Sequence, residues 1–246
     1  MDRMLYIAMN GAKHTMLAQA VNNQNLANVS TTGFRADLDA FRSQPVTGPG
    51  YNSRVYAAEE SSGSSFAQGT IVHTGNELDV AIDGDGWIAV QAPDGTEAYT
   101  RAGDLKITAQ GQLLTRENLP VLGNGGPIAL PPADKIELGS DGTISVLPTG
   151  QAPSTLAVID RIKLVNPPLE NLHKGKDGLF RANDGVALNP DANVQLVTGS
   201  LERSNVNAIE GLVKMISLAR EYEAHIKVMA TAKEIDESTA RLVSLN

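Results

Sequence analysis

The chain has 246 residues, a formal net charge of −8 and no cysteine, and its length suits one large domain or a few small ones. The acidic balance argues against a nucleic-acid or anionic-membrane partner, and the lack of cysteine excludes a disulfide scaffold, a cysteine zinc site and a thiol nucleophile. Aromatic residues make up only 4%, which disfavours a large aromatic-lined ligand pocket. No apolar run approaches the roughly 18 residues of a membrane span, and 4–9 is too short for the apolar part of a secretory signal. Composition alone therefore predicts a cytoplasmic chain, unless a route without a cleaved signal exports it.

The first segment has the spacing of an α-helix. Leu5, Met9, Ala12, Met16 and Leu26 fall on one helical stripe, which predicts a helix from about residue 3 to about residue 28. The hydroxyl and β-branched residues of 29–32 followed by a glycine predict its end. Since the stripe is weakly hydrophobic and rich in amides, such a helix gains stability from pairing with another.

A stretch rich in glycine, serine and proline follows, from about residue 45 to about residue 68. Its length favours an extended arm that reaches across space, and a surface loop is the alternative. We expect the arm to span 35–70, with a return segment at 198–205.

From residue 71 to about residue 197 the period changes to two, which is typical of strands. Leu78, Val80 and Ile82 alternate with other residues, and Asp-Gly pairs recur, as tight hairpin turns require. No long amphipathic helix interrupts the region, so an antiparallel sandwich or partial barrel is expected. We expect 83–86 to form a hairpin tip and Trp87 to place its ring in or beside the β core.

The last segment is again helical in its spacing. Apolar residues recur at steps of three and four from Leu212 through Met215, Tyr222 and Ile226 to Met229, and Asn207 is a start signal. A helix to the end of the chain would be about 60 Å long. It needs another long helix in this chain or in a neighbour, although a terminal helix folded onto its own domain is equally compatible with the spacing.

These elements predict an α+β fold with paired, coiled-coil-like terminal helices, a central antiparallel β domain and an extended arm. The expected domains are 1–34 with 206–246 for the helices, 35–70 with 198–205 for the arm, and 71–197 for the β domain.

Some fragments of the sequence begin like metal- or phosphate-binding motifs, but none of them is complete. The 83–86 run begins like a calcium loop, but the third acidic ligand would fall on Trp87 and the closing glutamate on Asp94. The glycines at 123–126 lack the Lys-Ser/Thr of a phosphate loop, and the four histidines have no metal-ligand spacing. We therefore predict no catalytic, cofactor or metal site.

The informative residues lie near the two ends. The run 25–35, Asn-Leu-Ala-Asn-Val-Ser-Thr-Thr-Gly-Phe-Arg, resembles the N-terminal signature of the bacterial flagellar rod and hook proteins, with Gln24 in place of the first asparagine of that signature. Ser204–Asn207, with Met215, Arg220 and Tyr222, is similar to the C-terminal signature of the same family. The run 79–82, followed by 86–87 and 99–103, resembles the opening of the family's β domain.

The resemblance implies a structural role. Members of this family pair their terminal helices, carry a β domain outward and polymerise into the helical axial tube of the flagellar basal body. It implies a periplasmic rod location, export through the flagellar type III apparatus without a cleaved signal, and contacts with proximal and distal rod proteins and with the surrounding ring proteins. It implies neither a nucleic-acid partner nor membrane insertion. The expected subunit-interface residues are Leu5, Met9, Met16, Asn25, Leu26, Asn28, Phe34, Asn205, Asn207, Leu212, Met215, Tyr222, Ile226 and Met229.

Within the family, the length and the 199–202 run most resemble proximal rod members, and distal rod members are the competing interpretation. Two readings from other classes are a periplasmic β-domain enzyme such as a carbohydrate hydrolase, and a binding module such as an assembly scaffold or cap. Enzymes concentrate informative residues on loops over a pocket, whereas here they lie on terminal helices, as subunit contacts require.

Overall fold

The structure, a computed structural model, describes residues 2–45, 55–60, 63–148, 150 and 156–244. The chain forms two compact units. The helical unit comprises Met1–Asn28, Asp37–Ser65 and Val206–Asn246, and the β unit comprises Val29–Ala36 and Phe66–Asn205. Each unit is built from segments that are distant in the sequence, so the chain passes between the units four times.

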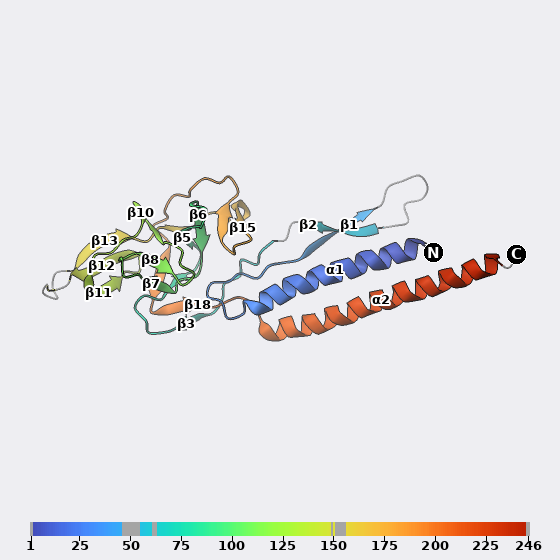
Figure 1. The fold of residues 1–246 in the computed structure, drawn as a ribbon. Helices are drawn as coiled ribbons and strands as arrows, with labels where there is room; N and C mark the ends of the chain where they lie inside the picture. The colour runs from blue at the N-terminus through green and yellow to red at the C-terminus, as the bar shows by residue number, and fades with distance from the viewer. Residues whose placement is uncertain (1, 46–54, 61–62, 149, 151–155, 245–246) are drawn as a thin grey trace. The chain divides into compact units, whose positions relative to one another are not determined.

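The helical unit contains two long helices and a hairpin. Helix α1 (Asp2–Ala27) and helix α2 (Ala208–Ser244) lie side by side and run in opposite directions, so that the start of α1 and the end of α2 share one end of the pair (Figure 1). Strands β1 (Ala40–Pro45) and β2 (Val55–Glu60) pair antiparallel, and β2 lies against α1. Both helices follow the sequence prediction, because their period and their end signals agree.

All the strand pairs in the described part of the β unit are antiparallel. A five-stranded sheet has the order β14-β5-β6-β16-β15, and a three-stranded sheet has the order β11-β12-β13. The remaining strands pair two by two, as β17-β4, β18-β3, β7-β8 and β10-β9. The bounds are β3 Ile71–His73, β4 Val80–Asp83, β5 Trp87–Gln91, β6 Glu97–Thr100, β7 Leu105–Ile107, β8 Leu113–Thr115, β9 Leu122–Gly123, β10 Gly126–Pro127, β11 Ala133–Leu138, β12 Thr143–Pro148, β13 Ala157–Arg161, β14 Leu164–Val165, β15 Leu172–Lys174, β16 Phe180–Ala182, β17 Gln195–Thr198 and β18 Ser200–Glu202, with one 3₁₀ turn at Leu169–Asn171.

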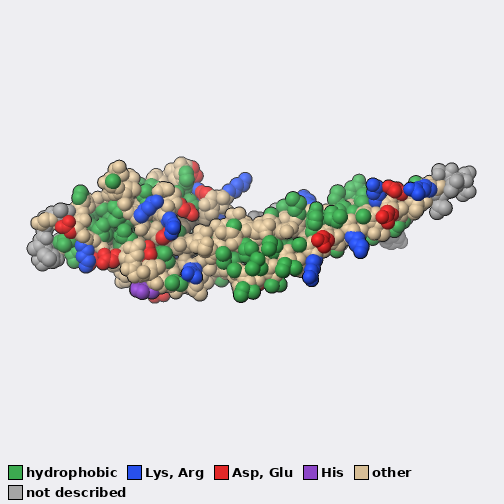
Figure 2. Space-filling view, turned by 60° about the horizontal axis from the view of Figure 1, so that its bottom comes forward, with side chains coloured by type: hydrophobic (Ala, Val, Ile, Leu, Met, Phe, Trp, Pro, Cys, Tyr) green, Lys and Arg blue, Asp and Glu red, His purple; other side chains and the backbone are tan. Residues whose placement is uncertain are grey.

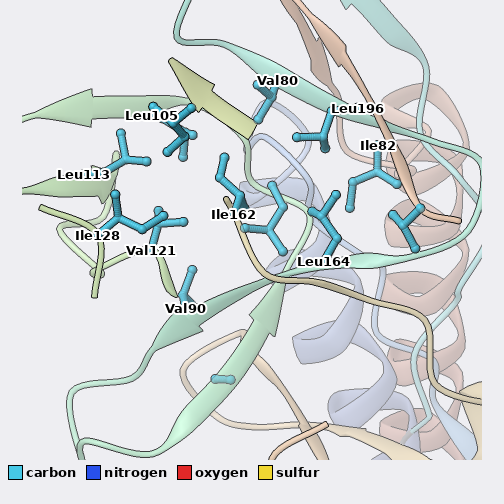
Figure 3. Close-up of a cluster of buried hydrophobic side chains, with 14 of the residues drawn as sticks. Val80, Ile82, Val90, Leu105, Leu113, Val121, Ile128, Ile162, Leu164 and Leu196 are labelled. Carbon is cyan, nitrogen blue, oxygen red and sulfur yellow. The ribbon is translucent and has the colours of Figure 1, made fainter. Parts of the chain in front are cut away.

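The five-stranded sheet is buried on both faces. Along β5, Ile88 and Val90 join an aliphatic cluster, whereas Trp87 and Ala89 join a second cluster on the opposite face. The aliphatic cluster gathers side chains from strands of several sheets and from the connections between them, as the labelled residues of Figure 3 show: Val80, Ile82, Val90, Leu105, Leu113, Val121, Ile128, Ile162, Leu164 and Leu196. The β unit therefore has two apolar cores separated by one sheet.

The second cluster, here called the aromatic cluster, is built around Trp87, Tyr99 and Phe180, with Phe66 packed against it. The rings of Trp87 and Phe180 have their centroids 4.4 Å apart, and Phe66 meets Trp87 edge-on at 6.2 Å. The Trp87 side chain is buried, as expected from the sequence.

The α+β fold class predicted from the sequence is confirmed, and three of the six Asp-Gly pairs lie in hairpins. Asp94-Gly95, Asp141-Gly142 and Asp177-Gly178 connect the paired strands β5–β6, β11–β12 and β15–β16. The hairpin predicted at 83–86 is wrong. Strand β4 pairs with β17 and β5 pairs with β6 and β14, so this segment carries the chain from one sheet to another.

The segment expected to be an extended arm has regular structure in some of its described parts. Residues 40–45 and 55–60 form the β1–β2 hairpin, and strand β18 lies within 198–205 and pairs with β3. The rest of the Gly/Ser/Pro-rich run, 46–54 and 61–62, lies outside the described residues. In the described residues, no helix is both long and apolar enough to cross a bilayer.

Candidate functional site

The contact between α1 and α2 is lined by small side chains. Ala8, Ala12, Thr15, Ala18 and Asn22 are the most buried residues of α1, and their spacing places them on one face. That face meets α2, since Asn22 Nδ2 donates to the carbonyl oxygen of Gly211 at 2.9 Å. Small side chains let the two helix backbones approach closely.

Gly11 lies on the same face and faces a ring. A Cβ atom added to Gly11 would lie 2.4 Å from Cε1 of His225 on α2, closer than side chains pack. A Cβ at Gly211 would likewise meet Leu26 at 2.8 Å. Both glycines therefore sit where a helix admits a side chain of its partner.

The apolar interface residues predicted on the helices lie mostly on the surface of this chain. Met16 is 63% exposed and Met9 51%, and Leu5, Leu212, Tyr222 and Ile226 are also exposed. Met215, Met229 and Leu26 are partly buried. Further exposed apolar side chains, absent from the sequence-based set, include Ile209 at 75% and Val213 at 63%. Figure 2 shows such hydrophobic side chains gathered along the helices.

One groove brings predicted residues from both helices together. Leu5 of α1 lies beside Ile226 and Met229 of α2, with Ala230, Ala232, Lys233 and Asp236 completing a groove of about 420 Å³. Met9 and Met16 are not among its lining residues. Smaller side chains of α1 occupy the seam with α2, and the placement of Leu5, Met9 and Met16 at contacts with neighbouring subunits stays a prediction.

The predicted asparagines hold backbone at the helix ends. Asn207 Oδ1 accepts from the N–H groups of Ile209 at 3.0 Å and Glu210 at 3.4 Å, so Asn207 caps the start of α2. Asn28 closes α1, because its N–H and its side-chain Nδ2 both donate to the carbonyl oxygen of Gln24.

Two further asparagines bind the backbone at two points each. Asn25 Nδ2 donates to the Asp37 carbonyl and Asn25 Oδ1 accepts from the Asp37 N–H, both at 2.8 Å. Asn205 Oδ1 accepts from the N–H of Ala36 at 2.8 Å and Asn205 Nδ2 donates to the carbonyl of Ala67 at 2.9 Å. Each asparagine uses its donor and its acceptor together, in the manner of a backbone amide.

The β unit contains a buried ionic cluster that sequence reasoning missed. Arg35 Nη1 lies 2.6 Å from Glu202 Oε1 and Arg101 Nη1 lies 3.0 Å from Glu202 Oε2, and all three side chains are at most 4% exposed. Glu202 Oε1 also accepts from the Gly69 N–H, and the Glu202 carbonyl accepts from the Gly33 N–H. Glu202 thus joins three other segments of the β unit, at 33–35, at 69 and at 101.

Two arginines share one carboxylate, and the Trp87 ring lies beside both guanidinium groups, 6.0 Å from Arg35 Cζ and 5.4 Å from Arg101 Cζ. Arg35 Nε and Nη2 and Arg101 Nε are buried without a hydrogen-bond acceptor. Burial lowers the pKa of Arg101, against the opposing effect of Glu202. The charged groups therefore lie within ion-pair distance of one another, although three of the buried guanidinium nitrogens have no hydrogen-bond acceptor.

The Gly-Phe-Arg part of the N-terminal motif has a physical explanation in this cluster. Gly33 has φ = +66°, and an added Cβ would lie 2.2 Å from the carbonyl carbon of Arg101, so no side chain fits there. The ammonium nitrogen of Lys174 lies 4.0 Å from the centroid of the Phe34 ring, and it also donates to the Arg35 carbonyl. The motif therefore anchors the chain after α1 within the β unit.

Among the described residues, no group of three or more His, Asp or Glu side chains is arranged to hold a metal ion. Asp85 lies near Arg101. It belongs to the segment 83–86, which is not expected to bind calcium and which connects strands of two different sheets.

The sequence of this chain is similar to known protein families and to individual proteins. Residues 81–146 match the family described as "Flagellar hook protein FlgE/F/G D1 domain", and residues 197–242 match "Flagellar basal body rod FlgEFG protein C-terminal". The chain is 40% identical to the flagellar basal-body rod protein FlgF of Salmonella typhimurium and 39% identical to that of Escherichia coli, in each case over 252 residues and 100% of both chains. It is 31% identical to the rod protein FlgG of Bacillus subtilis, over 98% of this chain and 99% of the relative. None of these names is that of an enzyme. The chain belongs to the family of flagellar basal-body rod proteins.

Proposed function

We propose that this chain is a structural subunit that polymerises through α1 and α2 into the helical axial tube of the proximal part of the flagellar rod. The observation that carries the proposal is the exposure of large apolar side chains on both helices, with Ile209 75% and Met16 63% exposed. Monomeric proteins rarely expose such contiguous apolar surface unless a partner covers it.

The exposed residues suit contacts between different faces of successive subunits. They lie on both helices and outside the α1–α2 seam, so a neighbour can cover them without opening the pair. Contacts between unlike faces produce open helical arrays rather than closed dimers. The proximal assignment is supported by the higher identity to FlgF than to FlgG, and the distal rod is the alternative.

The wider assignments follow from the family. The partners are other rod proteins on either side, with ring proteins facing the β unit, and the chain leaves the cytoplasm through the flagellar type III apparatus without a cleaved signal. The β unit forms an outer or intermediate layer of the tube and performs no catalysis. The asparagines, Phe34 and the apolar residues predicted from the sequence act at or next to subunit contacts.

Substitution in the apolar groove tests the proposal. Ile226→Asp places a carboxylate among Leu5 and Met229, and an unpaired charge covered by a neighbour costs several kcal/mol. Cells carrying this variant should make the protein, fail to incorporate it into isolated basal bodies and lose motility. Ser217→Asp, on an exposed polar position of α2, is the matched control and should assemble normally. Normal rods and swimming with Ile226→Asp would refute the proposed contact.

A further inference from the structure

Within the β unit, strands β11 and β17 meet at one point and then separate. The N–H of Leu196 in β17 donates to the carbonyl oxygen of Ser140, just after β11, at 2.7 Å. Beyond this bond a groove of about 440 Å³ opens, here called the strand groove. It is lined by residues 135–138, 198–199, His73, Gly75 and Glu77, all of the β unit. We propose that the strand groove receives an extended segment of another protein, which adds a strand between the two sheet edges.

The outer edge of β11 has free backbone groups. The N–H of Gly139 donates to the Thr143 carbonyl, so these two residues form a hydrogen-bonded pair next to the β11–β12 ladder. Along an antiparallel ladder, such pairs alternate with pairs whose N–H and C=O groups point outward. Ile136 and Leu138 hold the outward positions, and in the described residues β11 has no partner strand on that side. One wall of the strand groove therefore offers two N–H and two C=O groups.

The facing wall has the same property at Thr198. The N–H of Gly199 donates to the Asp79 carbonyl, so the next pair of the β17–β4 ladder, Thr198 with Val80, is one that points outward. Thr198 therefore directs its N–H and C=O away from β4, to the side on which Leu196 donates to the end of β11. Within the described residues these two groups of Thr198 form no hydrogen bond. An extended segment in the strand groove can bind backbone groups on both walls.

A strand that enters a slot between two sheet edges must have both of its own edges free. Each strand in the described part of this chain is already paired with another strand. A second copy in the same conformation therefore has no such strand to offer, which assigns the segment to a different protein. Spacings of about 3.3 Å along a strand, 4.8 Å between strands and 10 Å between packed layers give about 160 Å³ per residue. The strand groove thus has room for about three residues of its partner.

The side chains along β11 determine which residues the added strand should carry. Ile136 and Leu138 pack against the aliphatic cluster, so every second residue of an added strand faces the same core side and should be apolar. The residue between them lies on the face of Lys135 and Glu137, which form an ion pair at 2.7 Å. The charge of Glu77 acts on the same ammonium group. Because this face has two carboxylates for one lysine, the expected pattern is an apolar, a basic and again an apolar residue.

This inference goes beyond the proposed function, because it concerns a partner bound through the backbone of the β unit, whereas the proposed polymerisation uses α1 and α2. The full-length chain as a monomer is sufficient to test it, since every group of the strand groove lies in the β unit. Rod assembly is not part of the readout, so failure of the proposed polymerisation is detected separately.

The first arm of the experiment adds a peptide with the expected pattern, acetylated and amidated Thr-Val-Lys-Val-Thr, to the isotope-labelled full chain and follows the amide resonances. The Ile136, Leu138 and Thr198 amides should shift to saturation, because their N–H groups gain acceptors. The same peptide with both valine nitrogens methylated loses its donors to one wall and should bind roughly tenfold more weakly. Equal binding of the two peptides, or no shift at these three amides in millimolar peptide, would overturn the proposal.

The second arm tests the charge of the groove. Glu77→Lys should weaken binding of the lysine peptide by roughly threefold to tenfold and strengthen binding of Thr-Val-Glu-Val-Thr. Glu117→Lys, at an exposed position outside the strand groove, changes the net charge equally and should alter neither affinity. Equal effects of the two variants would mean that the peptide responds to net charge and would overturn the assigned pattern. Shifts of the same three amides with protein concentration alone would show a second copy in the groove and would overturn the assignment to a different protein.

Discussion

The side chain of Glu202 binds three partners at once. It binds Arg35, Arg101 and the Gly69 amide through one carboxylate that is 1% exposed. Partners 167 and 101 residues away in sequence meet there. Attraction between the groups offsets the cost of removing them from water only because the geometry is close and the carboxylate is multiply bonded.

Removing the negative charge should be strongly destabilising. Glu202→Gln leaves two buried guanidinium groups without a counter-charge, at a cost of about 3–5 kcal/mol. We expect a lower urea midpoint for the full chain, followed by fluorescence of Trp87, which lies beside both arginines. Glu117→Gln, at an exposed position, should change the midpoint little. Equal midpoints for the two variants would show that the cluster contributes little to stability.

The burial of Asp104 predicts that the stability of the fold depends on pH. Burial raises its pKa above the ordinary 3.8, against hydrogen bonds from its own backbone and Thr32 and the attraction of Arg116. A raised folded pKa stabilises the fold fully below the unfolded pKa, and this contribution is lost as pH rises through the folded pKa. At neutral pH the ionised form is therefore a cost.

Asp104→Asn removes that ionisation. The variant should gain stability relative to the wild type at about pH 7, and the gain should shrink as pH falls through the raised pKa of Asp104 towards its ordinary 3.8. Unfolding free energies from urea titrations across this range measure the difference. A difference that is independent of pH would contradict the assignment to Asp104.

None of these charged residues could be selected from the sequence as buried. Arginine and glutamate are mostly exposed, so composition places them on the surface by default. Arg35 lies in the motif that carried the family resemblance, but nothing near it in sequence indicates Glu202 or Arg101 as its partners. The usable signal was local: a glycine before Phe34-Arg35 indicates a backbone position with positive φ.

At the scale of elements, the period of the apolar residues predicted which segments are helices and which are strands. It did not predict which side chains form the contacts between them. Both helices and three of the Asp-Gly hairpins follow from the sequence, since their information is local. Hydrophobicity selects large residues such as Leu5, Met9 and Met16 as contact residues, and it does not select the small residues that line the seam between the helices. The seam is instead formed by Ala8, Ala12 and their neighbours, which leaves the large residues for other surfaces.

The Asp83–Gly86 segment shows the same limit. Asp-Gly indicates that the chain bends, but the partner of each flanking strand is decided by tertiary packing. Strand β4 has the buried triplet Val80, Ala81 and Ile82, with no wet face, which the alternation of polar and apolar residues did not indicate. The bend serves as a link between sheets rather than as a hairpin.

The aromatic cluster gives a test at this scale. Trp87→Ala removes the largest side chain of the cluster, which is 2% exposed, and should cost about 3–5 kcal/mol. Thermal unfolding of the full chain followed by circular dichroism should show a lower midpoint for the β unit. Val158→Ala, at a side chain that is 68% exposed, should change it little. An unchanged midpoint for Trp87→Ala would mean that the ring does not stabilise the unit, and a chelator should shift neither protein.

At the scale of the whole molecule, the two units differ in what holds them. The β unit has two buried apolar clusters, whereas the large apolar residues of the helices are mostly exposed in this chain. The order of the elements and the family came from the sequence. The pairing of β1 with β2 could not be predicted from the sequence, because the Gly, Ser and Pro residues around these strands indicated an arm.

This difference predicts unequal stability in the isolated chain. Limited proteolysis of the monomer should trim both terminal helices and leave a fragment that contains 71–197 and, because of the contacts at Glu202, extends to Asn205. In assembled rods the same helices should resist cleavage. Mass spectrometry of the fragments measures the boundaries. Strong protection of residues 2–27 in a verified monomer would contradict the prediction.

The sheet with an apolar core on each face changes what specifies strand pairing. A shift of β5 by one residue exchanges Ile88 and Val90 with Trp87 and Ala89. In a strand with one solvated face, such a slip is opposed because it exposes apolar side chains and buries polar ones. Here polarity does not distinguish the two registers, and the opposition comes from volume, since the indole would have to enter space shaped for aliphatic groups. The fidelity of pairing in β5 therefore depends on the size contrast between its faces, and a substitution that equalises them, such as Trp87→Leu, weakens register selection even where it preserves hydrophobicity.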